Sequence, residues 1–371
     1  MKRLLLLPFL IFLILFTASC SETTTSSTNS NTTNTYPVQA QATPLPATSA
    51  IGNFLEYPLP QTDSGMMRPA IDHEGRIWFG EMNNNFLASF DPRTHSFKQM
   101  TPPHGQFGIM GLQVASDDTI WFAEQYANYI GQYIPTTGQY HTYSLPNLTV
   151  PDPNHVGKTM TLPSAPNDLT IDAHGNIWFT ELNADSIGQL DPHTGLIQQF
   201  PLDAQKTAQT LDPYGITVDP QGRVWVTEAT NDHIICFDPS TGKLRTFIPQ
   251  LPNNQLMEIA SDAHGMIWAT SFSDGLLLSL DPVTGTFTPY YAPFTGNQAG
   301  GLYGLFISKT GEIWVTVSAE NMLARLDLTG KRFIFYPIPT PASLPLGLVV
   351  SSNSTIWFTE AGSNKIGMLK P

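Results

Sequence analysis

After residue 50 the chain alternates short apolar runs with turns, and no helical period persists in it. Residues 166–202 show one such unit. They contain "PNDLTIDAHGN", "IWFTELNAD", "SIGQLDPHTG" and "LIQQFPL" in succession. β-Branched and aromatic residues fill the runs, whereas Asp, Pro and Gly fill the turns, where a preset or positive φ is needed. The pattern therefore predicts four short strands in this unit.

Seven tryptophans mark seven copies of the unit: Trp78, Trp121, Trp178, Trp225, Trp268, Trp314 and Trp357. Each follows Ile or Val, and successive tryptophans lie 43, 57, 47, 43, 46 and 43 residues apart. Four strands repeated at this period are typical of a β-propeller. We expect an all-β, seven-bladed β-propeller over residues 51–371, with each tryptophan on the second strand of a blade and buried between neighbouring blades.

The seventh unit lacks its fourth strand, because "IWFTEAGSNKIGMLKP" (356–371) supplies only the second and third. The phrase "NFLEYPLP" (53–60) matches the fourth-strand phrase "RFIFYPIP" (332–339) of the unit before. We therefore expect this N-terminal strand to complete the last blade. Such a closure pairs two edges that would otherwise be left open.

The first fifty residues have a different character. Residues 1–19 form a signal-peptide pattern, with Lys2 and Arg3 before an apolar stretch too short to span a membrane comfortably. Its ending, "TASC", resembles a bacterial lipoprotein signal, in which Cys20 becomes the lipidated first residue. Residues 20–50 are rich in Ser, Thr and Asn and predict a disordered tether. We expect a protein exported to the cell envelope and lipid-anchored at the outer face of a bacterial membrane; secretion after ordinary cleavage is the alternative.

The composition limits the partners. The formal net charge is −13, and such a surface repels phosphate backbones, which argues against nucleic-acid binding. We expect a monomer that touches a membrane only through its lipid. With Cys20 lipidated, Cys236 is left alone in a strand pattern, where a single cysteine is usually an inert, buried apolar residue.

The pattern "P-x-G-I…I-W-F-T-E-x-x-x-N-x-I-G-x-L", together with "EYPLP", resembles the streptogramin B (virginiamycin B) lyase family over residues 51–371. Members of that family are seven-bladed propellers that open a cyclic lactone antibiotic by elimination with a magnesium ion. The resemblance thus implies that the protein is a carbon–oxygen lyase. It also implies magnesium as a cofactor, which no other feature of the sequence indicates.

The family's catalytic residues do not carry over to this chain. In the lyases, the x of "P-x-G-I", eleven residues before the tryptophan, is histidine in two blades, and a glutamate stands two residues before one of them. Here that slot holds Met67, Met110, Asn167, Tyr214, Met257, Tyr303 and Leu346. The slot two residues earlier holds Gly65, Gly108, Ala165, Asp212, Gln255, Gly301 and Leu344. Elimination needs a positioned base, and the resemblance assigns neither a base nor a metal ligand.

Charged residues interrupt the repeat at one position. The residue ten before the tryptophan is glycine in four units, but it is Arg68, Asp168 and Glu258 in the other three. We expect these side chains at the mouth of the central channel, either as a polar ligand site or as an ion-pair plug. Candidate ligand contacts beside them are Asn167, Met67, Met110, Tyr214, Met257 and Tyr303. These soft and aromatic side chains suit an apolar ring; packing of the channel wall is the alternative.

Two further features have candidate roles. The longest spacing between tryptophans contains an insertion, residues 147–165, which predicts a lid or a partner-binding loop with His155 and Lys158 as polar contacts. Five glutamates follow their tryptophans by three residues. A ring of carboxylates predicts a cation site; alternatively, because the glutamates recur at the same position of the repeat, they predict hydrogen bonds to the backbone. They are Glu81, Glu124, Glu181, Glu228 and Glu360.

Three functions are compatible with these observations. The first, which the missing histidines favour, is an envelope propeller that binds a small molecule or a protein partner at the channel mouth. The second is a streptogramin B lyase-like or lactone-opening enzyme with a rearranged site, dependent on magnesium or not. The third is a purely structural surface module.

Overall fold

The computed structural model of the chain describes residues 44–104, 108–152, 155, 157–202, 211–251, 255–293 and 301–371. The expected signal peptide, Cys20 and the tether up to residue 43 lie outside these ranges. In the described part the only helical segments are two single 3₁₀ turns, η1 (Leu182–Ala184) and η2 (Ser318–Glu320). No helix within those ranges is long and apolar enough to cross a membrane.

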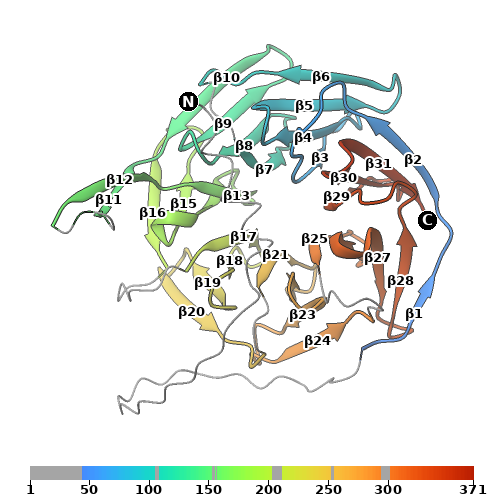
Figure 1. The fold of residues 1–371 in the computed structure, drawn as a ribbon. Coiled ribbons are helices and arrows are strands. Elements are labelled where there is room, and N and C mark those ends of the chain that lie inside the picture. The colour runs from blue at the N-terminus through green and yellow to red at the C-terminus, as the bar shows by residue number, and fades with distance from the viewer. Residues whose placement is uncertain are drawn as a thin grey trace. The chain divides into compact units, whose positions relative to one another are not determined.

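Seven blades, each with four antiparallel strands, stand around a central channel, as predicted (Figure 1). The sheet of the sixth blade has a fifth strand, β1 (Ala47–Ser49), at its outer edge. In blade order, the innermost strands are β3 (Ala70–Ile71), β7 (Ile109–Val114), β13 (Pro166–Ile171), β17 (Pro213–Val218), β21 (Leu256–Ser261), β25 (Leu302–Ile307) and β29 (Pro345–Val350). The second strands are β4 (Ile77–Glu81), β8 (Ile120–Glu124), β14 (Ile177–Glu181), β18 (Val224–Glu228), β22 (Ile267–Ser271), β26 (Ile313–Val317) and β30 (Ile356–Glu360).

The outer half of each blade is built in the same order. The third strands are β5 (Phe86–Asp91), β9 (Tyr129–Ile134), β15 (Ser186–Leu190), β19 (Ile234–Asp238), β23 (Leu276–Leu280), β27 (Met322–Asp327) and β31 (Lys365–Lys370). The outermost are β6 (Ser96–Met100), β10 (Gln139–Ser144), β16 (Ile197–Pro201), β20 (Lys243–Phe247), β24 (Phe287–Tyr291), β28 (Arg332–Pro337) and, for the seventh blade, β2 (Asn53–Pro58).

The N-terminal strand closes the ring as predicted. Strand β2 pairs antiparallel with β31 over six residues, from Asn53 opposite Lys370 to Pro58 opposite Lys365. Residues 44–50, which we expected to belong to the tether, include a short strand. Strand β1 (Ala47–Ser49) pairs in parallel with β28 of blade 6, and the backbone N–H of Leu45 donates to the carbonyl of Tyr291 in blade 5. Hydrogen bonds to two outer strands thus order a segment whose composition alone predicts disorder.

The tryptophans lie on the second strands and are buried, with exposed fractions of 0 to 5%. In four blades the aspartate that opens the turn after the innermost strand accepts the indole N–H, as Asp172 does from Trp178 at 3.0 Å. The same carboxylate accepts two backbone N–H groups of its turn, those of His174 and Asn176. The recurring "D-x-x-G" turn therefore satisfies polar groups that would otherwise be buried without partners.

A break in strand pairing at the start of the innermost strands shapes the channel. In six blades the ladder between the first and second strands shifts register across the x slot and the residue after it, as between Pro166 and Leu169. The residue two before the x slot has positive φ in all seven blades: Gly65, Gly108, Ala165, Asp212, Gln255, Gly301 and Leu344. Bulges of this kind re-aim side chains, and here they turn the slot residues toward the channel.

The glycines of the repeat have a packing reason. A Cβ on Gly215 would lie 2.5 Å from the carbonyl oxygen of Met257 in the next blade, and one on Gly304 would lie 2.3 Å from that of Leu346. Neighbouring innermost strands therefore approach each other too closely for a side chain at this glycine to point toward the next blade. Arg68, Asp168 and Glu258 take this position in blades 1, 3 and 5, and each is followed by a blade with glycine there.

Candidate functional site

The three charged residues meet at one end of the channel, where the innermost strands begin; we call this end the mouth. The Arg68 guanidinium pairs with Glu258 through two contacts, Nε to Oε2 at 3.0 Å and Nη2 to Oε1 at 2.6 Å. Its Nε also lies 3.5 Å from Oδ1 of Asp168. All three residues are buried, with 5 to 8% of their surface exposed. The ion cluster thus links blades 1, 3 and 5 across the channel.

Burial and charge oppose each other within the cluster. Burial works against the charge of Arg68, but Asp168 and Glu258 outweigh it and hold the pKa of Arg68 well above its usual range. Burial raises the pKa of Asp168 to about 7, against the attraction of Arg68 and two backbone hydrogen bonds. Two carboxylates face one guanidinium, so the cluster carries one excess negative charge when Asp168 is ionised.

An apolar layer covers the ion cluster. Met67, Met110, Tyr214 and Tyr303 form its buried part. The phenol groups of Tyr214 and Tyr303 are hydrogen-bonded to each other, and the Arg68 guanidinium lies 5.3 Å from the Tyr214 ring centre. Partly exposed side chains pack against these four: Met82, Leu182, Ala229, Met257, Phe272 and Leu346. The surface that a ligand would meet at the mouth is therefore apolar.

Several of these surface residues were missed from the sequence. Met82, Leu182, Ala229 and Phe272 each follow their tryptophan by four residues. The signal that could have found them is strand register, because Glu181, one position earlier, lies opposite Pro166 at the start of the innermost strand. A residue just beyond the second strand therefore comes out at the mouth.

Asn167 is fully buried and holds neighbouring blades together. Its Nδ2 donates to the carbonyl of Tyr214 in blade 4 at 3.1 Å, and its Oδ1 accepts from Gln125 in blade 2 at 3.3 Å. Both ends of the amide are engaged by protein. Asn167 therefore belongs to the wall of the mouth, although we expected it among the ligand contacts.

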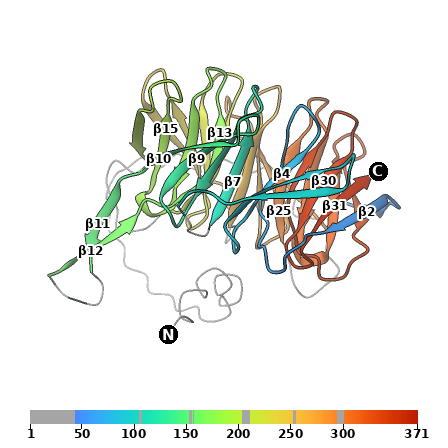
Figure 2. The same ribbon diagram turned by 90° about the horizontal axis from the view of Figure 1, so that it is seen from above.

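His155 does not join the mouth. It lies on the arm formed by β11 (Asn147–Pro151) and β12 (Thr159–Pro163), which pair with each other. The arm extends outward from the ring and does not cover the channel (Figures 1 and 2). At its tip Nδ1 of His155, an exposed residue, lies 2.8 Å from Oδ2 of Asp152. The prediction of a ligand contact at His155 is thus at odds with the fold, because paired strands hold the insertion as a ribbon away from the mouth.

The five repeating glutamates are buried at the mouth end of their blades. Four of them contact side chains, not the backbone groups that their recurrence suggested: Glu81, Glu181, Glu228 and Glu360. Glu181 accepts from Gln199 and Ser186, and Glu81 accepts from Gln99. Burial raises the pKa values of Glu124 and Glu360 to about 7. Each glutamate belongs to its own blade, so the five do not form a common cation site.

The mouth does not fit the magnesium ion that the resemblance implies. Its two carboxylates, Asp168 and Glu258, are paired with Arg68. Throughout the residues that the structure describes, no group of three or more His, Cys, Asp or Glu side chains is arranged to hold a metal ion. A hard cation prefers several oxygen ligands, so we derive no step through magnesium.

The fold is a seven-bladed β-propeller, and its architecture is similar to that of streptogramin B lyases. A sequence model of the Virginiamycin B lyase family matches residues 205–371. A virginiamycin B lyase of Staphylococcus aureus is 42% identical over 45 residues, a match that spans 12% of this chain and 15% of that protein.

Solved structures support the same architecture over most of the chain. A streptogramin B lyase structure superposes with a TM-score of 0.74 at 26% identity, covering 86% of this chain and 97% of its own. A catalytically inactive virginiamycin B lyase variant from Staphylococcus aureus, determined with quinupristin, also gives a TM-score of 0.74, at 24% identity. That match covers 86% of this chain and 99% of the other.

Proposed function

We propose that this chain is an exported propeller whose mouth binds a small molecule carrying an apolar or aromatic ring. The observation that carries the proposal is the layer of partly exposed Met, Leu and Phe side chains over a self-paired ion cluster. Large apolar side chains that gather at the surface indicate a binding site. The sequence supports the same choice, because no slot of the repeat holds the lyase histidines.

The ion cluster adds a polar contact beneath the layer. Nη1 of Arg68 has no hydrogen-bond partner among the described residues and is buried. A buried donor without a partner is costly, and a carbonyl oxygen that reaches it would remove that cost. The excess negative charge of the cluster disfavours an anion at this point. The mouth thus favours a neutral ligand in which an apolar ring stands beside a carbonyl acceptor.

Ligand screening of the folded domain tests the proposal, with intrinsic fluorescence and calorimetry as readouts. For a ligand found in this way, Leu182→Ala should weaken binding about fivefold to thirtyfold, since truncation removes roughly 1–2 kcal/mol of apolar contact. Leu196→Ala is the matched control, because Leu196 is 65% exposed in a turn between outer strands. Equal affinity of both variants and the wild type would show that the mouth is not the binding site.

A lyase-like or lactone-opening reaction is the second candidate, and two observations favour it. The structural match is to streptogramin B lyases, and burial raises the pKa of Asp168 to about 7, where a carboxylate accepts protons effectively. In such an elimination the carboxylate takes a proton from carbon, a carbon–carbon double bond forms, and the carbon–oxygen bond breaks with its electrons on oxygen.

The two candidates are separated by incubating the protein with a streptogramin B, with Mg²⁺ or with EDTA, and analysing the product by chromatography and mass spectrometry. Elimination opens the ring without a change of mass, whereas hydrolysis adds a water. Turnover that Asp168→Asn abolishes would establish the enzyme. Binding without turnover would support the first candidate.

The location and assembly state belong to the same proposal. The N-terminal pattern supports export and lipidation at Cys20, with the propeller acting as a monomer in the cell envelope. Mass spectrometry of the mature N-terminus tests the lipid. Cys20→Ala should release the protein from the membrane fraction if the lipid is its anchor.

A further inference from the structure

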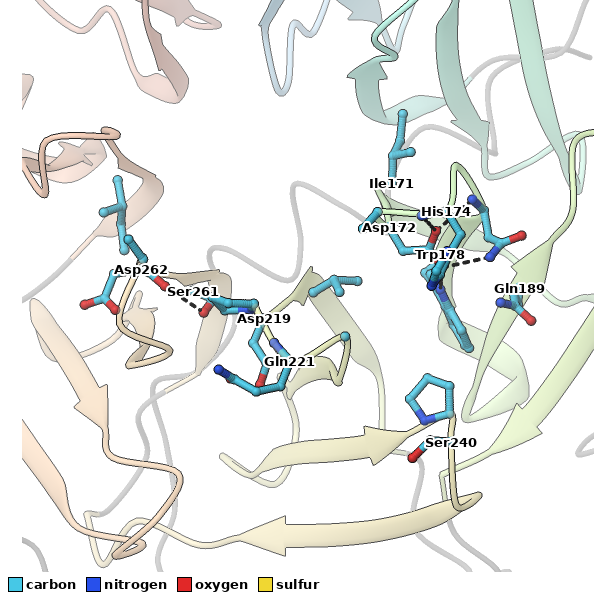
Figure 3. A pocket seen from close by; sticks show the side chains of 18 of the residues that line it. Ile171, Asp172, His174, Trp178, Gln189, Asp219, Gln221, Ser240, Ser261 and Asp262 are labelled. Atoms are coloured by element: carbon cyan, nitrogen blue, oxygen red, sulfur yellow. Dashed lines mark hydrogen bonds between the residues drawn. The ribbon is translucent and has the colours of Figure 1, made fainter.

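The opposite end of the channel contains a cavity of about 750 Å³ (Figure 3). The turns that follow the innermost strands of blades 3 to 6 line it, and Ile171, Val218 and Ile307 lie at its inner side. The innermost strands of these blades are six residues long. At 3.3 Å per residue they separate the cavity from the mouth by roughly 20 Å. The cavity is therefore independent of the site proposed above.

The carboxylates of the cavity wall are already engaged. Asp172, Asp219 and Asp262 line the cavity, and each accepts the indole N–H of its blade's tryptophan at 2.8 to 3.2 Å. Each also accepts two backbone N–H groups of its own turn. Their lone pairs are consequently occupied, which argues against a cation site.

An anion is disfavoured as well. The three aspartates surround the cavity with negative charge, and hydrogen bonds lower the pKa of Asp172 in spite of its burial, so it stays ionised at neutral pH. Lys309 is the cationic side chain among the lining residues. Arg223 pairs with Asp219 at 2.6 Å, so Lys309 and Arg223 against three carboxylates still leave the wall net negative.

Besides Lys309, the polar groups that face a ligand are imidazole, amide and hydroxyl groups. His174, Gln189, Gln221 and Ser240 line the cavity from blades 3 and 4, and their labelled side chains surround it in Figure 3. Within the described residues, the imidazole of His174 and the amide of Gln189 make no side-chain hydrogen bond. These groups offer both donors and acceptors, next to apolar strips formed by the inner residues.

We propose that this cavity binds a neutral polyhydroxylated compound of the saccharide class. Hydroxyl groups both donate and accept, so they match the imidazole of His174 and the amide of Gln189, while the C–H faces of a sugar ring match Ile171, Val218 and Ile307. The volume lies within the range of about 300–1,000 Å³ that is usual for small-molecule sites. The engaged carboxylates and the net negative wall select against ionic ligands of either sign.

The test uses the full-length protein with maltotriose and tri-N-acetylchitotriose as probes, followed by ligand-observed NMR and tryptophan fluorescence. We expect saturable binding of at least one sugar in the millimolar range, weakened about tenfold by His174→Ala or Gln221→Ala. The matched control is His264→Ala. His264 occupies the same turn position in blade 5, but it is not among the residues that line the cavity.

All three substituted side chains are exposed in turns, so the variants should fold, which thermal unfolding verifies. Three results would overturn the proposal. They are an absence of saturable binding of either sugar, tighter binding of inorganic phosphate or tetramethylammonium than of the sugars, and an equal loss in His264→Ala. None of them depends on whether a ligand is found at the mouth.

Discussion

Replacing Arg68 by methionine probes the ion cluster at the mouth most directly. Methionine keeps much of the side-chain volume but removes the guanidinium that pairs with Glu258 at 2.6 Å and with Asp168 at 3.5 Å. Both carboxylates would then be buried without a counterion. Removing one partner of a buried ion pair costs about 3–5 kcal/mol, and we expect a loss of this order in the free energy of unfolding at pH 8.

The loss should depend on pH with a defined sign. The pKa of Asp168 is raised by folding from 3.8 to about 7, so the folded state holds a proton that the unfolded state releases first. Stability from this group is present in full below pH 3.8 and is lost as the pH rises toward 7. Without the charge of Arg68, which opposes the rise, the pKa of Asp168 should be raised further. The deficit of Arg68→Met should therefore shrink between pH 8 and pH 5.

Urea unfolding followed by tryptophan fluorescence at the two pH values measures this difference. Arg93→Met is the matched control, since Arg93 is exposed and pairs with Asp91 at the surface. It should change stability little at either pH. A loss of equal size at pH 8 and pH 5, or no loss at pH 8, would show that the guanidinium does not offset buried negative charge and would refute the argument.

Three further predictions concern the scaffold. A chain that starts at residue 61 lacks β1 and β2, and it should unfold at much lower temperature than one that starts at residue 44, because six paired residues of blade 7 are lost; similar melting temperatures would contradict ring closure. Gly215→Ala should destabilise by roughly 1–3 kcal/mol, because its Cβ would lie 2.5 Å from the Met257 carbonyl; chemical denaturation measures it. Burial raises the pKa of Cys236 to about 12, so native protein should react with a thiol reagent far more slowly than unfolded protein.

The location of the candidate site could be predicted from the repeat. Nine of the ten predicted contacts lie at the mouth or in its wall, because residues at one offset from each tryptophan occupy equivalent places in every blade. His155 is the exception. It lies in an insertion outside the repeat, where offset carries no information about position.

The role of the site residues could not be predicted in the same way. Sequence spacing left open whether Arg68, Asp168 and Glu258 form a ligand site or a plug. The structure pairs them with one another under a layer of apolar side chains. The contacts join residues 100 to 190 positions apart in the chain. Their distances in space depend on how the blades close into a ring.

The sequence by itself determined the number of blades, the burial of the tryptophans and the strand that closes the ring, because these follow from local periodicity and turn chemistry. Only the tertiary structure decided which side chains face the channel, which of them neutralise each other, and that a cavity lies at the far end. Those properties arise where innermost strands from different blades meet. Bulges and the close approach of neighbouring backbones set the direction of each side chain there. Neither can be predicted from the alternation of apolar and polar residues within one strand.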